Sequence, residues 1–121
     1  MKRIEPAPIY KGFPCSAVAV GCARQAARRS DVKALKSPEL KDGGYLSLKG
    51  MNALVRANLA VVKQVKFKRG ERPLLREFAR QIKGQKAIVC VLGHYVYFDG
   101  KDYWSYFWNG GDEVVSAWII Q

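Results

Sequence analysis

The sequence predicts an α+β protein in which N-terminal helices pack on a C-terminal antiparallel sheet. Helical spacing of apolar residues dominates the first two thirds of the chain, whereas β-branched and aromatic runs dominate the last third. These runs are separated by Gly-containing turns and lie at 87–92, 95–98, 103–108 and 114–120, as in an antiparallel meander. With 121 residues, the chain is expected to form a single domain over 1–121 with one core.

The first part of the chain is expected to begin with an extended arm over residues 1–14, because its prolines exclude regular helix. A helix is predicted from Cys15 to about Arg29, since this run is rich in alanine and its final arginines complement the helix dipole. Residues 30–46, which include Gly43-Gly44, are expected to form a loop with one helical turn.

The middle of the chain predicts two further helices and one strand. The second helix is expected over about 48–59 with Ser47 as its N-cap, and the third over about 73–83. The alternating segment 61–68 predicts a strand between them. Further on, Asp99-Gly100 between two β-type runs indicates a hairpin turn.

Charge is distributed unevenly along the sequence. Residues 1–86 contain 20 Lys or Arg and 6 acidic residues, whereas residues 87–121 contain 1 and 4. A basic region of this kind permits an anionic partner such as nucleic acid or an acidic protein, although a solvated charged surface gives the same composition. No apolar stretch approaches the roughly 20 residues that span a bilayer, and no signal-like segment follows the start. We therefore expect a cytoplasmic protein without membrane contact.

The three cysteines, Cys15, Cys22 and Cys90, are odd in number and lack paired C-x-x-C spacing. Free thiols are therefore expected, with neither a metal site nor a cofactor. Cys22 and Cys90 have the surroundings of core residues. Cys15 has two interpretations: a small buried apolar residue, or a reactive thiol whose thiolate is favoured by the dipole and free N–H groups of a helix start.

His94 is the only histidine, and it precedes the apolar run 95–98. A lone histidine in such a place is often structural, but a cysteine nucleophile requires an imidazole base that is remote in sequence and close in space. We expect the Cys15 sulfur within about 4 Å of a His94 ring nitrogen. Asn109, one hairpin later, could accept a hydrogen bond from the imidazole, although Asn109-Gly110 could equally be a simple turn. Asp112 is the alternative third residue.

Three short motifs carry a family resemblance: Pro14-Cys15-Ser16-Ala17-Val18-Ala19, Gly93-His94-Tyr95-Val96 and Trp108-Asn109-Gly110. Together they resemble the papain-like cysteine peptidase superfamily, and more closely its small forms in bacteriocin exporters and phages. The resemblance spans most of the chain, including a closing strand at 114–119. It implies a papain-like fold, and hydrolysis of a peptide or amide bond in a peptide or protein substrate by Cys15, His94 and Asn109.

One position departs from the pattern of this family, which often places a glutamine about six residues before the cysteine as an oxyanion donor. Ile9 occupies that position, with Tyr10 beside it. Either Tyr10, Ser16 or the backbone completes the oxyanion hole, or the protein is an inactive relative. An inactive relative would bind nucleic acid or an acidic protein through the basic surface of residues 1–86. Since exporter-type relatives cut after paired glycines, Gly43-Gly44 is a candidate self-processing site.

Overall fold

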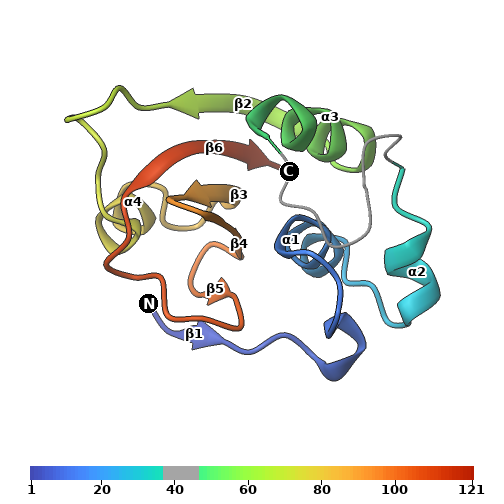
Figure 1. Cartoon of the computed structure of the whole chain (residues 1–121). Helices are drawn as coiled ribbons and strands as arrows, with labels where there is room; N and C mark the ends of the chain where they lie inside the picture. The colour runs from blue at the N-terminus through green and yellow to red at the C-terminus, as the bar shows by residue number, and fades with distance from the viewer. Residues whose placement is uncertain (37–46) are drawn as a thin grey trace.

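The computed structural model describes residues 1–36 and 47–121, where helices surround a mixed six-stranded sheet (Figure 1). The helices are the 3-10 helix η1 (Pro8–Tyr10), α1 (Cys15–Ala23), α2 (Arg29–Lys33), α3 (Leu48–Asn58) and α4 (Leu75–Gln81). The strands are β1 (Arg3–Ile4), β2 (Val61–Lys66), β3 (Lys86–Val91), β4 (His94–Phe98), β5 (Tyr103–Trp104) and β6 (Val114–Ile120). The predicted α+β class is therefore confirmed.

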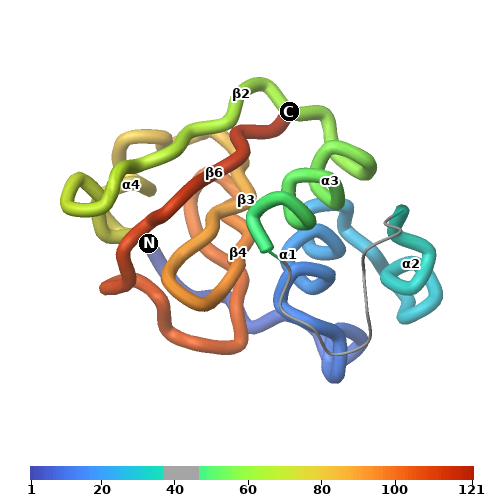
Figure 2. The backbone as a smooth tube through the Cα atoms, turned by 45° about the horizontal axis from the view of Figure 1, so that its top comes forward, coloured from blue at the N-terminus to red at the C-terminus, as the bar shows by residue number. Residues whose placement is uncertain are grey.

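The sheet separates two apolar clusters, where the sequence predicted one core. Along β3, Ile88 and Cys90 pack with α1 and α3, whereas Val89 and Val91 pack with α4. Figures 1 and 2 show α4 at the side of the sheet away from these two helices. The physical reason is that β3 has apolar residues at nearly every position, so both of its faces require cover.

The strand order is β1-β5-β4-β3-β6-β2, which differs from the expected meander. Strands β3, β4 and β5 are successive neighbours, but β6 then returns to lie between β3 and β2. The N-terminal arm adds β1 parallel to β5, and every other neighbouring pair is antiparallel. Strand β5 ends at Trp104, so most of the predicted strand 103–108 is a connection.

Helix α1 begins at Cys15 as predicted but ends at Ala23, six residues before Arg29. Its end is a Schellman motif, in which Ala26 N–H donates to Gly21 O and Gln25 N–H to Cys22 O, each over 3.0 Å. Gln25 takes the left-handed position with φ +56°, which glycine usually occupies. The usual glycine signal for a helix end is therefore missing from this part of the sequence.

The other predicted elements of the middle region lie close to their expected bounds. Ser47 accepts a hydrogen bond from Gly50 N–H over 3.2 Å and caps α3 as predicted. The Asp99-Gly100 turn is also confirmed, since Asp99 Oδ1 accepts from the backbone N–H of Asp102 over 2.7 Å. The Gly43-Gly44 pair lies outside the described residues. Within the part described, no helix is long and apolar enough to cross a membrane.

Candidate functional site

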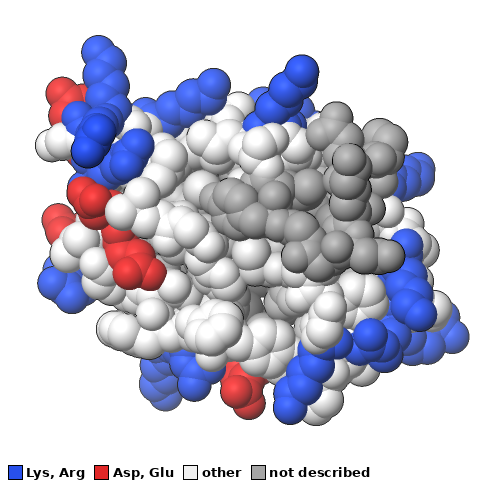
Figure 3. All heavy atoms as spheres, viewed as in Figure 1, with Lys and Arg blue, Asp and Glu red and all other residues white. Residues whose placement is uncertain are grey.

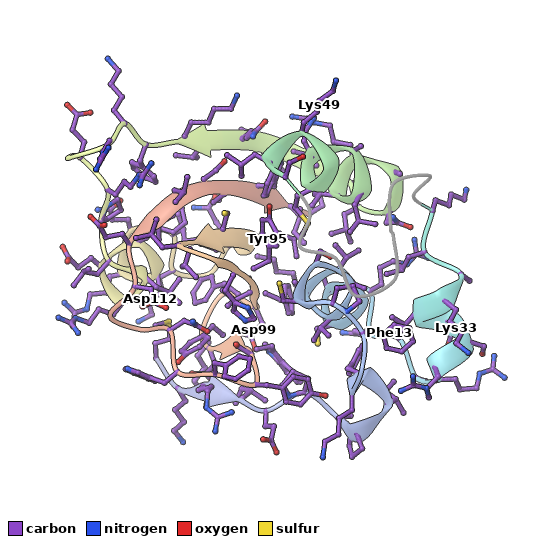
Figure 4. All side chains as sticks on the ribbon, viewed as in Figure 1. Phe13, Lys33, Lys49, Tyr95, Asp99 and Asp112 are labelled. Atoms are coloured by element: carbon purple, nitrogen blue, oxygen red, sulfur yellow. The ribbon has the colours of Figure 1, made fainter. Side chains whose placement is uncertain are left out.

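Cys15 and His94 line the same small cavity of about 80 Å³. Cys15 is the first residue of α1, after the extended Pro14, and His94 is the first residue of β4. Both placements agree with the sequence prediction. The cavity is otherwise walled mainly by aromatic side chains, including Phe13 and Phe107. Figure 4 labels Phe13 beside α1 and Tyr95 on β4, the residue after His94.

The Cys15 thiol is half-buried, and this burial raises its pKa above the ordinary cysteine value. Backbone N–H groups of Tyr95, Ser16 and Cys15 act in the opposite direction and lower the pKa, but burial has the larger effect. The expectation that the helix start favours a resting thiolate is thus not met. Cys15 rests as a thiol, beside donors that would stabilise negative charge once it forms.

In the described part of the chain, no hydrogen bond joins the Cys15 sulfur to a His94 nitrogen. The thiol instead lies near the Tyr95 backbone N–H, one peptide unit beyond His94, and the two side chains share the wall of the cavity. The structure thus shows no thiol–imidazole hydrogen bond, and the predicted separation of about 4 Å between the two atoms stays a prediction.

His94 begins a chain of hydrogen bonds whose next member, Ser105, also lines the cavity. Its Nε2 atom lies 3.0 Å from Ser105 Oγ, and the Ser105 hydroxyl donates to Asn109 Oδ1 over 2.9 Å. Asn109 Nδ2 in turn donates to Asp112 Oδ2 over 2.8 Å. Ser105 and Asn109 are both buried, so these side chains satisfy one another away from solvent.

The direction of this chain fixes the tautomer of His94. The Asp112 carboxylate can only accept, so Asn109 presents its amide N–H to Asp112 and its oxygen to Ser105. The Ser105 hydroxyl has one proton, which it donates to Asn109, so it must accept from His94. Nε2 therefore carries the proton, and Nδ1 keeps its lone pair. Among the described residues, Nδ1 has no hydrogen-bond partner.

Burial lowers the pKa of His94 below its usual 6.5, and the nearby Asp112 carboxylate offsets part of this shift. The Phe107 ring, whose centroid lies 5.6 Å from that of the imidazole, covers it edge-on. At neutral pH, His94 is consequently a neutral imidazole with one available lone pair. This is the protonation state that a general base requires.

The structure changes the predicted role of Asn109. Asn109 does not contact the imidazole, because Ser105 stands between them, and Asp112 belongs to the same chain instead of replacing Asn109. Ser105 was not among the residues predicted for the site. Ser105 is the only non-aromatic residue in the run 103–108, and this contrast is the sequence feature that could have marked it as a site residue.

Of the two predicted oxyanion donors, Tyr10 lies at the wrong end of α1. Its hydroxyl donates to Ala26 O over 2.9 Å and its ring lies against Gly21, so it does not line the cavity. Ser16 is fully buried, and its Oγ has no hydrogen-bond partner within the described ranges. Backbone N–H groups at Cys15 and its neighbours are therefore the remaining donors near the thiol.

No known protein family, curated protein or solved structure matches this chain. The residues at 1–36 and 47–121 also contain no group of three or more His, Cys, Asp or Glu that could hold a metal ion.

Proposed function

We propose that this protein is a cysteine hydrolase of papain-like type that acts on a peptide or amide bond. The observation that carries the proposal is the direction of the hydrogen bonds from Asp112 to His94, which leaves Nδ1 unprotonated on a residue that lines the same cavity as Cys15. The resemblance of the sequence motifs to papain-like peptidases supports the same assignment.

In the proposed reaction, His94 Nδ1 takes the proton of the Cys15 thiol while the sulfur attacks the substrate carbonyl carbon. Backbone N–H groups near the thiol hold the oxygen as it becomes negative. Nδ1–H then gives its proton to the leaving nitrogen, the C–N bond breaks and a thioester remains. Water then attacks the thioester carbon while Nδ1 takes its proton, and the C–S bond breaks as Nδ1–H protonates the sulfur. The carboxylic acid is released and the free thiol is regenerated.

Cys15 and His94 both rest in their neutral forms, so the thiol proton moves to His94 only when the substrate is in place. The pKa of Cys15 is raised by burial and that of His94 is lowered by burial, which disfavours a standing thiolate–imidazolium pair. With a volume of about 80 Å³, the cavity has room for only a few non-hydrogen atoms. We therefore propose that the acyl group bound next to the sulfur is small.

The test uses p-nitrophenyl acetate, whose acyl group is small and whose leaving group is easily followed. Acetylation should occur at Cys15, as located by peptide mass spectrometry, and His94→Gln should slow it about 100-fold or more. Cys22→Ala is the control, since Cys22 is buried and does not line this cavity. Equal acetylation rates in the wild type and His94→Gln would refute the proposed base.

The alternative function is a protein that keeps the fold without the chemistry and binds an anionic partner through residues 1–86. The absent thiol–imidazole hydrogen bond favours it. On the face drawn in Figure 3, Lys and Arg lie around the outline and do not form one patch. An inert Cys15 in the acetylation experiment would favour this alternative.

A further inference from the structure

A second cavity, on the α4 side of the sheet, is lined by four cationic side chains. Its volume is about 510 Å³, within the range of roughly 300–1,000 Å³ that is typical of ligand sites. Its cationic lining residues are Arg76, Arg80, Lys83 and Lys101. The apolar part of its lining includes Phe98 and Trp108, and no acidic residue contributes among those described.

The four cations have no ion-pair partner in the described part of the chain. Arg76 and Arg80 are four residues apart on α4, so they lie on the same side of the helix. Asp99 interacts electrostatically with Lys101 without forming an ion pair. A concave surface with several unpaired charges of one sign raises the local concentration of anions.

Trp108 gives this cavity an aromatic edge. Its side chain is 63% exposed, and the ring lies against Gly110, where an added Cβ would stand 2.6 Å from a ring atom. The Tyr103 ring contacts it as well, with centroids 5.9 Å apart. Trp108 is therefore held in position while most of its surface remains accessible. Held aromatic rings beside basic groups are the usual platform for unpaired bases.

We propose that this cavity binds single-stranded nucleic acid, with a base stacked on Trp108 and neighbouring phosphates on the four cations. Planar guanidinium groups such as those of Arg76 and Arg80 match phosphate geometry. An acidic peptide would satisfy the cations equally well but would make no use of the exposed indole. The site lies on the other side of the sheet from Cys15, so this proposal can fail without affecting the hydrolase proposal.

The experiment measures binding of a fluorescently labelled ten-nucleotide thymidine strand by anisotropy at several salt concentrations. For single strands, the slope of log affinity against log salt is about −0.7 for each phosphate neutralised. Arg76→Gln/Arg80→Gln should therefore reduce the slope by about 1.4. Trp108→Ala should weaken binding roughly 5- to 150-fold, because stacking contributes about 1–3 kcal/mol per base, and Trp108→Phe should restore most of it.

Lys63→Gln/Lys66→Gln is the matched control, because it removes the same charge from exposed positions on β2, at the other edge of the sheet from β1 and β5. It should leave the slope nearly unchanged. If both double variants reduce the salt slope equally, binding is due to general charge attraction, and the proposed site is wrong. Tighter binding of polyglutamate than of the strand, or full competition by free thymidine monophosphate at equal concentration, would likewise overturn a single-strand site. Circular dichroism melts establish that each variant is folded.

Discussion

Ser105 Oγ lies 3.0 Å from His94 Nε2, so a neutral hydroxyl, and no carboxylate or amide, is the direct partner of the only histidine. The negative charge that orients the ring is that of Asp112, and it acts through two intervening side chains. This arrangement orients the imidazole while only partly offsetting the effect of burial on its pKa. Its consequences can be measured directly.

The first prediction concerns the pKa of His94. Because burial lowers it, a proton NMR titration of the single imidazole should give a value below 6.5. Asp112→Asn should lower it further, since the carboxylate that favours the imidazolium is removed. Asp102→Asn is the control and should cause no comparable change. A higher pKa in Asp112→Asn would show that the electrostatic assignment is wrong.

The second prediction concerns Ser105→Ala, which leaves His94 Nε2 and Asn109 Oδ1 without their partner. Unfolding free energy should fall by about 1–3 kcal/mol, because buried polar groups lose their hydrogen bonds. Nitrogen NMR shifts of the imidazole should change from the pure Nε2–H tautomer to a mixture. In the hydrolase assay, kcat should fall while KM stays similar. Ser30→Ala, at an exposed serine, serves as the control.

The third prediction is a dependence of stability on pH. The pKa of His94 is lowered in the folded state, so as pH falls the unfolded chain takes up this proton first. The stabilisation from neutral His94 is complete above about pH 6.5 and is lost as pH falls toward the folded pKa. Urea unfolding at pH 7.5 and 5.0 should show a larger loss for the wild type than for His94→Gln. An equal loss in both proteins would contradict this linkage.

The fourth prediction compares two glycines with positive φ. Gly70→Ala should lower the free energy of unfolding by about 1 kcal/mol, because φ is +90° at this position. The space around an added Cβ is open, so no steric clash adds to this backbone strain. Gly100→Ala combines φ +101° with a contact of 3.2 Å between the new Cβ and the Gly84 backbone. Because backbone atoms move aside less readily than side-chain atoms, Gly100→Ala should lower the thermal midpoint more than Gly70→Ala does. Similar midpoints for both variants would mean that the Gly84 contact is unimportant.

The sequence predicts the residues that begin elements better than the contacts between elements. Cys15 and His94 were correctly placed because helix starts and strand starts have local signals, a proline in one case and a β-rich run in the other. Ser105 was missed because its role depends on His94 and Asn109, which both lie outside the run 103–108. Tyr10 was misplaced because η1 carries it to the C-terminal half of α1 and not to the start of that helix.

The N-terminal strand has a consequence for the order in which this protein folds. Ile4 O accepts from Ser105 N–H, and an Arg3 guanidinium N–H donates to Ser105 O, each over 3.1 Å. Segments about a hundred residues apart must therefore meet before the Ser105 hydroxyl is in position. Contacts of such long sequence separation form slowly. In refolding experiments, the imidazole should reach its final tautomer in the same kinetic phase in which β1 docks, after the local helices have formed.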